Sequence, residues 1–124
     1  MADFLVDSSA WIAYLYGPDK EAKSILDGDS VVVLSVISLF EVRRTLVRRG
    51  VRSMDVEKAL SFMRRRGIVV DVNRVIAEAA ADISFKHRLS TADALIYATA
   101  QEKQAELLTG DEDFAKLKNV RLLK

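Results

Sequence analysis

The chain has 124 residues, with 19 Lys and Arg against 18 Asp and Glu and a formal net charge of +1. This length predicts one domain over residues 1–124, and the balanced charge leaves nucleic-acid binding open, because only a local excess of cations would attract a polyanion. The absence of cysteine and the single histidine, His87, exclude disulfides, thiolate metal sites and His-rich zinc sites. The N-terminal segment has no basic region and acids interrupt its apolar run, so we expect a soluble, cytoplasmic protein without a signal peptide or membrane span.

Short apolar segments alternate with helical segments along the chain. In chain order, we expect a strand at Phe4–Val6, helices at Ser8–Tyr16 and Lys20–Leu26, a strand at Val31–Leu34, helices at Val36–Arg49 and Ser53–Arg66, a strand at Ile68–Val72, helices at Asn73–Arg88 and Thr91–Lys103, a strand at Glu106–Thr109, a short helix that holds Phe114 and Leu117, and a strand at Val120–Leu123. This alternation predicts an α/β fold in which helices cover both faces of a parallel sheet. In such sheets ligands bind beyond the carboxyl ends of the strands.

Acidic residues stand where the predicted strands end. Asp7 and Asp111 each follow a strand, and each has an ordinary interpretation as a helix N-cap. Asp93 lies three residues after Ser90, the spacing of a capping box, at a helix N-terminus that favours an acid. If the two strands are neighbours, Asp7 and Asp111 converge in one cleft, but the sequence spacing does not say whether Asp93 points into it.

The helix expected at Val36–Arg49 has an apolar stripe, and Glu41 lies well off that stripe. The stripe consists of Val36, Leu39, Phe40, Val42, Leu46 and Val47. Taken alone, Glu41 is interpreted as an exposed glutamate that pairs with Arg44 at i+3.

Three segments together resemble a known family. They are "FLVDSSAWIAYL" from Phe4, "LSVISLFEVRRTL" from Leu34 and "LSTADALIYATAQEKQAELLTGDEDF" from Leu89. In this order and at these separations, they resemble the PIN domain, and most closely the small toxins of VapBC-type toxin–antitoxin systems. The resemblance covers nearly the whole chain and implies a three-layer α/β/α sandwich with a parallel sheet of about five strands.

The resemblance also implies a site and an activity. It assigns an acidic quartet, which consists of Asp7, Glu41, Asp93 and Asp111. Three further positions match auxiliary residues of the family: Ser8, Thr109 and Asp113. The implied activity is metal-dependent endonucleolytic cleavage of RNA.

Four carboxylates in one cleft would repel one another unless a cation neutralised them. Oxygen ligands without His or Cys favour Mg²⁺ or Mn²⁺ over zinc. We expect Asp7 and Asp111 to be direct ligands and Glu41 and Asp93 to bind the ion or to orient its water. In this hypothesis a metal-activated water attacks an RNA phosphodiester, with one ion or two, while Thr109 and Ser8 hold the carboxylates by hydrogen bonds.

Arginine is concentrated between Arg43 and Arg66, which predicts either a solvated surface or a site for RNA phosphates. Arg44 and Arg48 are the best candidates for phosphate contacts because they lie on the Glu41 side of their helix. The resemblance further implies a homodimer and an antitoxin partner, whose tail these arginines could bind instead. Large side chains that we expect mostly in the core could also line a dimer contact or a groove: Trp11, Tyr14, Tyr16, Phe62 and Met63.

Three alternatives stay open at this stage. One is a PIN-type RNA-processing nuclease without an antitoxin. Another is a receiver-like phosphoacceptor domain, although serines follow Asp7 where a second acid is expected and no Lys directly follows Asp111. The third is a binding module without catalytic activity. We interpret His87 as a residue of a helix C-cap, and with no second histidine a ribonuclease A-like mechanism is excluded.

Overall fold

The structure is a computed structural model that describes residues 2–124. The strands are β1 (Phe4–Val6), β2 (Val32–Ser35), β3 (Ile68–Val70), β4 (Glu106–Thr109) and β5 (Val120–Leu122). The helices are α1 (Ser8–Tyr16), α2 (Lys20–Leu26), α3 (Val36–Arg48), α4 (Ser53–Arg66), α5 (Arg74–His87), α6 (Thr91–Glu102) and the 3₁₀ helix η1 (Glu112–Phe114). Each predicted element is present, with strand bounds that differ from the prediction by two residues or fewer, but the predicted short helix ends at Phe114 and does not include Leu117. Among residues 2–124, no helix has both the length and the hydrophobicity that crossing a bilayer requires.

The five strands form one parallel sheet in the order β3-β2-β1-β4-β5. Strands β1 and β4 pair, with Leu5 opposite Leu107, which meets the condition for Asp7 and Asp111 to converge. The chain builds outward from β1 to β2 and β3, and then crosses to the other side of β1 for β4 and β5. The topological switch point therefore lies between β1 and β4, where this class of fold keeps its ligands.

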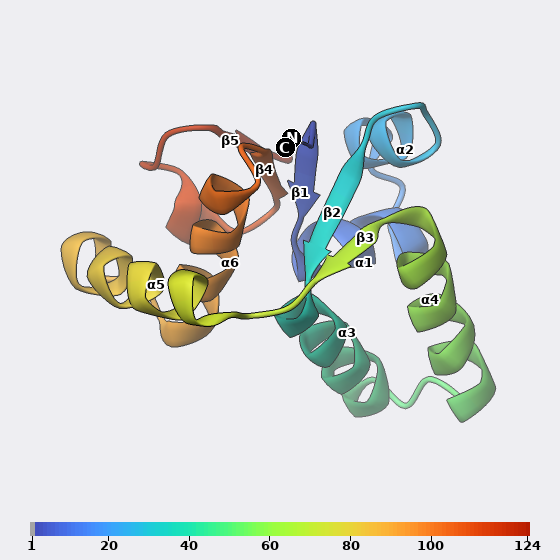
Figure 1. Cartoon of the computed structure of the whole chain (residues 1–124). Helices are drawn as coiled ribbons and strands as arrows, with labels where there is room; N and C mark the ends of the chain where they lie inside the picture. Colours follow the sequence, from blue (N-terminus) through green and yellow to red (C-terminus); the bar gives the residue numbers. More distant parts are fainter. Residues whose placement is uncertain (1) are drawn as a thin grey trace.

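Alternate residues of the strands face two separate cores, as a sheet covered on both faces requires. Phe4 and Val6 pack with α1, α2, α3 and α4, whereas Leu5 between them packs with α5 and α6. Figure 1 shows the sheet between these two layers of helices. The predicted three-layer sandwich is confirmed.

The predicted apolar stripe of α3 is wrong in part. Phe40 and Val47 are each 59% exposed, while Ser38 is buried together with Val42 and Leu46. At 100° per residue, Phe40 and Val47 lie on the side of the helix opposite Val42, which faces the core. The hydrophobic residues of α3 are thus divided between the core and the solvent, and position on the helix rather than hydrophobicity decides which are buried.

The helix ends follow ordinary capping chemistry, with one correction. After α3, Gly50 adopts a left-handed φ of 76°, a backbone conformation common for the glycine that ends a helix. After α5 the C-cap is Arg88, with φ 56°, so His87 is the last helical residue and not the cap itself.

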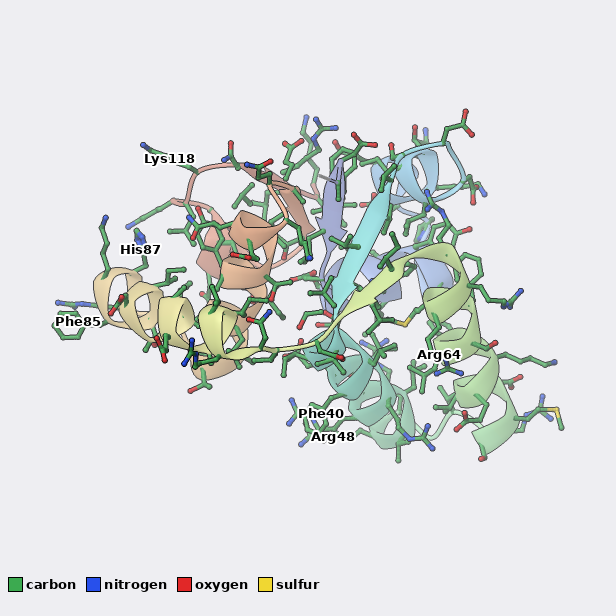
Figure 2. The ribbon with its side chains drawn as sticks, viewed as in Figure 1. Phe40, Arg48, Arg64, Phe85, His87 and Lys118 are labelled. Carbon is green, nitrogen blue, oxygen red and sulfur yellow. The ribbon has the colours of Figure 1, made fainter. Side chains whose placement is uncertain are left out.

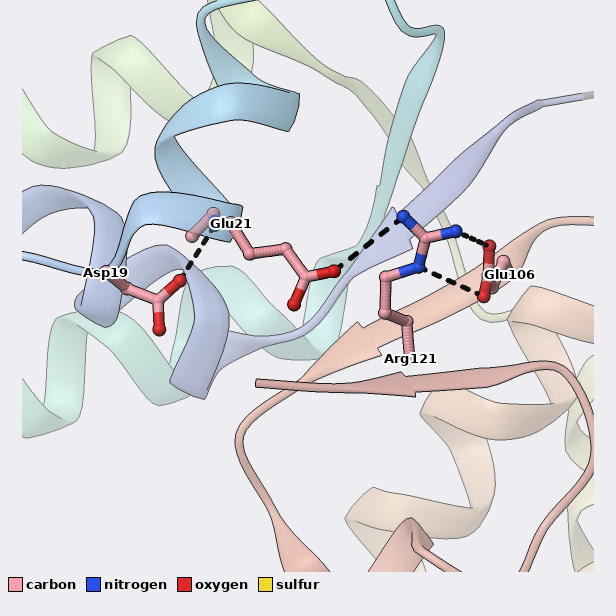
Figure 3. A network of polar contacts seen from close by, with 5 residues as sticks. Asp19, Glu21, Glu106 and Arg121 are labelled. Atoms are coloured by element: carbon pink, nitrogen blue, oxygen red, sulfur yellow. Dashed lines mark hydrogen bonds and ion pairs between the residues drawn. The ribbon is translucent and has the colours of Figure 1, made fainter. Parts of the chain in front are cut away.

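A polar network ties the sheet to α2 near the amino end of β4 (Figure 3). Arg121 of β5 binds Glu106 of β4 at 3.2 Å and approaches Glu21 of α2 at 3.7 Å. Its guanidinium also lies 5.1 Å from the centre of the Phe4 ring. Exposed ion pairs of this kind contribute at most about 1 kcal/mol each.

Candidate metal centre

The acids that follow β1 and β4 are both helix caps, as predicted from the sequence. The Asp7 carboxylate accepts a hydrogen bond from the Ala10 N–H, and the Asp111 carboxylate accepts one from the Asp113 N–H. The Ser90 hydroxyl likewise accepts the Asp93 N–H at the start of α6. The caps fix the backbone from which these carboxylates project, so the ordinary role of each acid also brings it to the switch point.

A threonine hydroxyl joins the ends of β1 and β4. Thr109 Oγ1 donates to Asp7 Oδ2 at 2.7 Å and accepts the Asp111 N–H at 2.9 Å. Thr109 is fully buried and Asp7 is only 3% exposed. One hydroxyl thereby holds the Asp7 carboxylate and the start of the Asp111 loop in a fixed relation.

Ser9, which the sequence did not single out, contacts the first acid. Ser9 Oγ donates to Asp7 Oδ1 at 2.6 Å and accepts the Gly110 N–H at 2.8 Å. It also lies 3.3 Å from the Thr109 hydroxyl. Ser9 is two residues after Asp7, a spacing at which a serine hydroxyl commonly bonds a neighbouring residue. This spacing indicates a contact with Asp7, but Ser8 is also next to Asp7, so the sequence does not show which serine makes it.

Ser8 bonds Glu41 instead. Its hydroxyl donates to Glu41 Oε1 at 2.9 Å, and this bond crosses from α1 to α3. Glu41 is half-buried, so its interpretation as an exposed glutamate is wrong, and the predicted pairing with Arg44 is absent among the hydrogen bonds and ion pairs of residues 2–124. The contact with Ser8 turns Glu41 toward the ends of the strands.

The tightest group of carboxylates consists of Asp93, Asp111 and Asp113. One oxygen from each lies within 4.8 Å of the others, although the three come from α6, the β4–η1 loop and η1. Asp7 and Glu41 lie outside this group. Asp7 accepts a hydrogen bond from Thr109, and Glu41 accepts one from Ser8. The structure therefore gives Asp113, which the sequence suggested only as auxiliary, a more central position than Asp7.

Burial and mutual repulsion raise the proton affinity of two of these acids. Burial, opposed by the hydrogen bonds from Ser9 and Thr109, raises the pKa of Asp7. Partial burial raises the pKa of Asp93 to about 6, and the negative charges of Asp111 and Glu41 add to the effect. A cluster in this state gains by binding a cation.

The donor set fits a hard divalent cation. It offers carboxylate oxygens from separate elements, and in residues 2–124 no Lys or Arg forms an ion pair with Asp93, Asp111 or Asp113. Mg²⁺ and Mn²⁺ accept such oxygens and keep water or phosphate as their remaining ligands.

The two predicted RNA-binding arginines, Arg44 and Arg48, lie on the exposed side of α3. Neither forms an ion pair within residues 2–124, and the Arg44 guanidinium lies 4.9 Å from the centre of the Phe40 ring. His87 lies at the far end of α5, away from α3 (Figure 2).

The sequence matches the PIN domain family over residues 4–120. The chain belongs to the PIN domain family. This membership, together with the fold, removes the receiver-like alternative. Comparison of the sequence with curated proteins gives no match.

Solved structures of PIN proteins superpose on nearly the whole chain. A toxin–antitoxin complex from Klebsiella pneumoniae is 27% identical, with a TM-score of 0.77 and 96% of each chain covered. VapC20 from Mycobacterium tuberculosis, a toxin that cleaves the sarcin–ricin loop, is 24% identical, with a TM-score of 0.78, and the match covers 98% of this chain and 100% of that one. VapBC2 from Rickettsia felis, bound to a DNA fragment of its promoter, is 14% identical, with a TM-score of 0.74 and 98% of each chain covered. These neighbours share the fold of this chain.

Proposed function

We propose that this PIN protein is a Mg²⁺- or Mn²⁺-dependent endoribonuclease and the toxin of a VapBC-type toxin–antitoxin pair. The observation that carries the proposal is the convergence of Asp93, Asp111 and Asp113 within 4.8 Å at the switch point of the sheet, where no Lys or Arg among residues 2–124 pairs with them. The resemblance to the Klebsiella complex and to a toxin that cleaves RNA supports the same conclusion.

The catalytic residues in this proposal are Asp7, Glu41, Asp93 and Asp111, with Asp113 as a further ligand. Asp93, Asp111 and Asp113 would hold the ion directly, since their oxygens already lie together. Asp7 Oδ1 already accepts two hydrogen bonds, from the Ser9 hydroxyl and the Ala10 N–H, whereas Oδ2 accepts only the one from Thr109 and keeps a lone pair for a ligand. Its low exposure and fixed rotamer suit a residue that sets the geometry of the whole site.

The remaining residues orient these acids and the substrate. Thr109 and Ser9 restrict Asp7, and Ser8 restricts Glu41, so that neither carboxylate needs to reorient when substrate arrives. When bound, the divalent ion supplies positive charge to the scissile phosphate and lowers the pKa of a bound water. In this proposal Glu41 accepts a hydrogen bond from water, and Arg44 and Arg48 contact flanking phosphates.

The proposal includes partners. An antitoxin partner agrees with the toxin–antitoxin complexes among the structural neighbours. We also propose a homodimer, a cytoplasmic location and one PIN-like domain across residues 1–124, in keeping with the sequence resemblance.

Cleavage of a defined RNA by the purified protein tests the function. We expect cuts in Mn²⁺ or Mg²⁺ and none in EDTA. The new ends should carry no 2′,3′-cyclic phosphate, because water rather than the RNA 2′-hydroxyl is the proposed nucleophile. Cleavage that persists in EDTA, or ends with 2′,3′-cyclic phosphate, would contradict the proposal.

A further inference from the structure

Ser38 is the one buried side chain among residues 2–124 whose polar atom has no hydrogen-bond partner. It lies in the first turn of α3 and is fully shielded from solvent. The other fully buried hydroxyls in this part of the chain each have a hydrogen bond, and they belong to Ser35, Thr99 and Thr109. An unpaired buried hydroxyl destabilises the folded protein, which points to a role other than stability.

The start of α3 explains why Ser38 has no partner within its own helix. A serine or threonine inside a helix commonly donates to the carbonyl four residues before it, as Thr99 does to Leu95 at 2.7 Å. The residue four before Ser38 is Leu34, which belongs to strand β2 and not to the helix. The hydroxyl is therefore available to a partner other than the backbone of α3.

The Ser38 side chain lies at the edge of the sheet that carries the acids. Side chains of a helix lean toward its N-terminus, and α3 begins where β2 ends, at the carboxyl ends of the strands. Around the helix, Ser38 lies between the buried Val42 and Glu41. Glu41 bonds Ser8, the residue that directly follows Asp7, so this turn of α3 faces the end of β1.

Glu41 has a free carboxylate oxygen on the same side of α3 as Ser38. The two residues are three apart, so their side chains are neighbours on the helix surface. Ser8 bonds Glu41 Oε1, and among residues 2–124 no donor bonds Glu41 Oε2. The negative charge of Glu41 raises the pKa of both Asp7 and Asp93, so its carboxylate lies near both acids.

We propose that Ser38 is a positioning residue for Glu41: when a divalent cation draws the Glu41 carboxylate inward, the Ser38 hydroxyl donates to its second oxygen. Ser8 and Ser38 then hold one oxygen each, as two hydroxyls already hold Asp7. The inference rests on the proposed function, because it needs a cation at the acids. It makes the same hydroxyl unfavourable in the metal-free protein and favourable in the metal-bound one.

Metal-free stability and Mn²⁺ affinity together test the proposal, because a serine that only supports the fold would change the first alone. We would measure the Tm in EDTA by differential scanning calorimetry and the Kd for Mn²⁺ by isothermal titration calorimetry. The variants are Ser38→Ala, Glu41→Ala and the double variant. The matched control is Ser35→Ala, since Ser35 is equally buried but its hydroxyl accepts the Ile37 N–H at 3.1 Å.

We expect Ser38→Ala to weaken Mn²⁺ binding about tenfold, the loss typical of a residue that orients a metal ligand. The metal-free Tm should stay unchanged or rise by about 3 °C, because the substitution removes an unpaired polar atom. In the Glu41→Ala background, Ser38→Ala should have no further effect on the Kd. Ser35→Ala should lower the metal-free Tm by about 3 °C through loss of the N-cap and keep the Mn²⁺ affinity.

Unchanged Mn²⁺ affinity in Ser38→Ala would overturn the inference, as would a metal-free Tm that falls as far as in Ser35→Ala. An equal loss of affinity in the Glu41→Ala background would assign the hydroxyl to another acceptor, and an equal loss in Ser35→Ala would show a general disturbance of α3. Either of these results would also overturn it. Failure of the unmodified protein to bind Mn²⁺ or to cleave RNA would instead refute the proposed function.

Discussion

Carboxylates lie together at two places along the sheet, and among residues 2–124 only one of the two groups pairs with an arginine. Near the amino end of β4, Glu106 and Glu21 share the guanidinium of Arg121, at 3.2 and 3.7 Å. Beyond its carboxyl end, Asp93, Asp111 and Asp113 lie within 4.8 Å of one another with no protein cation paired to them in residues 2–124.

We interpret the acids that pair with Arg121 as support for the fold and the unpaired acids as ligands for a cation. The Arg121 network is complete without any other molecule, whereas the second cluster raises the pKa of Asp93 to about 6 through burial and the charges around it. Holding unpaired charges together destabilises the metal-free protein, and a divalent cation removes that penalty. The comparison can be tested by making the same chemical change in both places.

The largest effect should come from Asp93→Asn. We expect at least a roughly hundredfold loss of metal-dependent RNA cleavage, because the change removes a proposed ligand rather than a residue that only supports one. The matched variant is Glu106→Gln, which removes one carboxylate charge from the Arg121 network and should leave cleavage unchanged. Since Asp93 also lies in the first turn of α6, thermal melts must show that Asp93→Asn stays folded. Near-equal activity of the two variants would show that the two groups of carboxylates do not differ in their contribution to cleavage.

The next effect should come from Thr109→Val, which keeps the shape of the side chain. It removes the hydroxyl that donates to Asp7 and accepts the Asp111 N–H. We expect activity to fall about 10–100-fold and stability by about 1–3 kcal/mol, since a buried carboxylate loses a partner. Thr99→Val is the control, because Thr99 is equally buried but its hydroxyl bonds only the Leu95 carbonyl within α6. A similar loss of cleavage in both variants would show that general destabilisation is the cause.

The pH dependence of stability should differ with and without metal. A carboxyl whose folded-state pKa is raised, as that of Asp93 is from 3.8 to about 6, contributes stability that is complete below pH 3.8 and is lost as the pH rises through about 6. We therefore expect Mg²⁺ to raise the Tm more at pH 7.5 than at pH 5.

Asp111→Asn, which keeps an N-cap acceptor and removes a charge, should raise the metal-free Tm at pH 7.5 by about 3 °C, or roughly 1 kcal/mol after solvent screening. Differential scanning calorimetry gives both values, and a metal effect that is larger at pH 5 would refute the electrostatic account.

The smallest effect should be on the salt dependence of RNA binding. Arg48→Ala is expected to lower the slope of log K against log salt by about 0.7, the value for one phosphate contact on a single strand. Arg121→Ala removes the same charge from the Arg121 network and should leave the slope unchanged. Equal slopes in Arg48→Ala and the unmodified protein would show that Arg48 is an ordinary surface charge.

The sequence predicted the fold and the general position of the site because both depend on local patterns. Apolar segments such as Phe4–Val6 and Glu106–Thr109 identified strands, and the acids after them had to meet once those strands paired. Helix capping gave Asp7, Asp93 and Asp111 their backbone positions, and capping can be recognised within four residues of sequence.

Side-chain direction could not be predicted in the same way. Ser8 and Ser9 are 100° apart on α1, so which of them reaches Glu41 and which reaches Thr109 and Gly110 depends on how the whole helix is rotated against its neighbours. Phe40 looked like a core residue because it is hydrophobic, yet the packing of α3 places small Ser38 inside and Phe40 outside. Tertiary packing, which local sequence does not specify, decided both cases.

The most direct test of the account is anomalous diffraction from crystals of the protein soaked in Mn²⁺. We predict an anomalous peak bounded by carboxylate oxygens of Asp93, Asp111 and Asp113, which disappears in crystals of Asp111→Asn and has no counterpart at the Arg121 network. A protein that binds no Mn²⁺ at millimolar concentration, or binds it only away from the carboxyl ends of β1 and β4, would contradict the claim that these acids are assembled to hold a divalent ion.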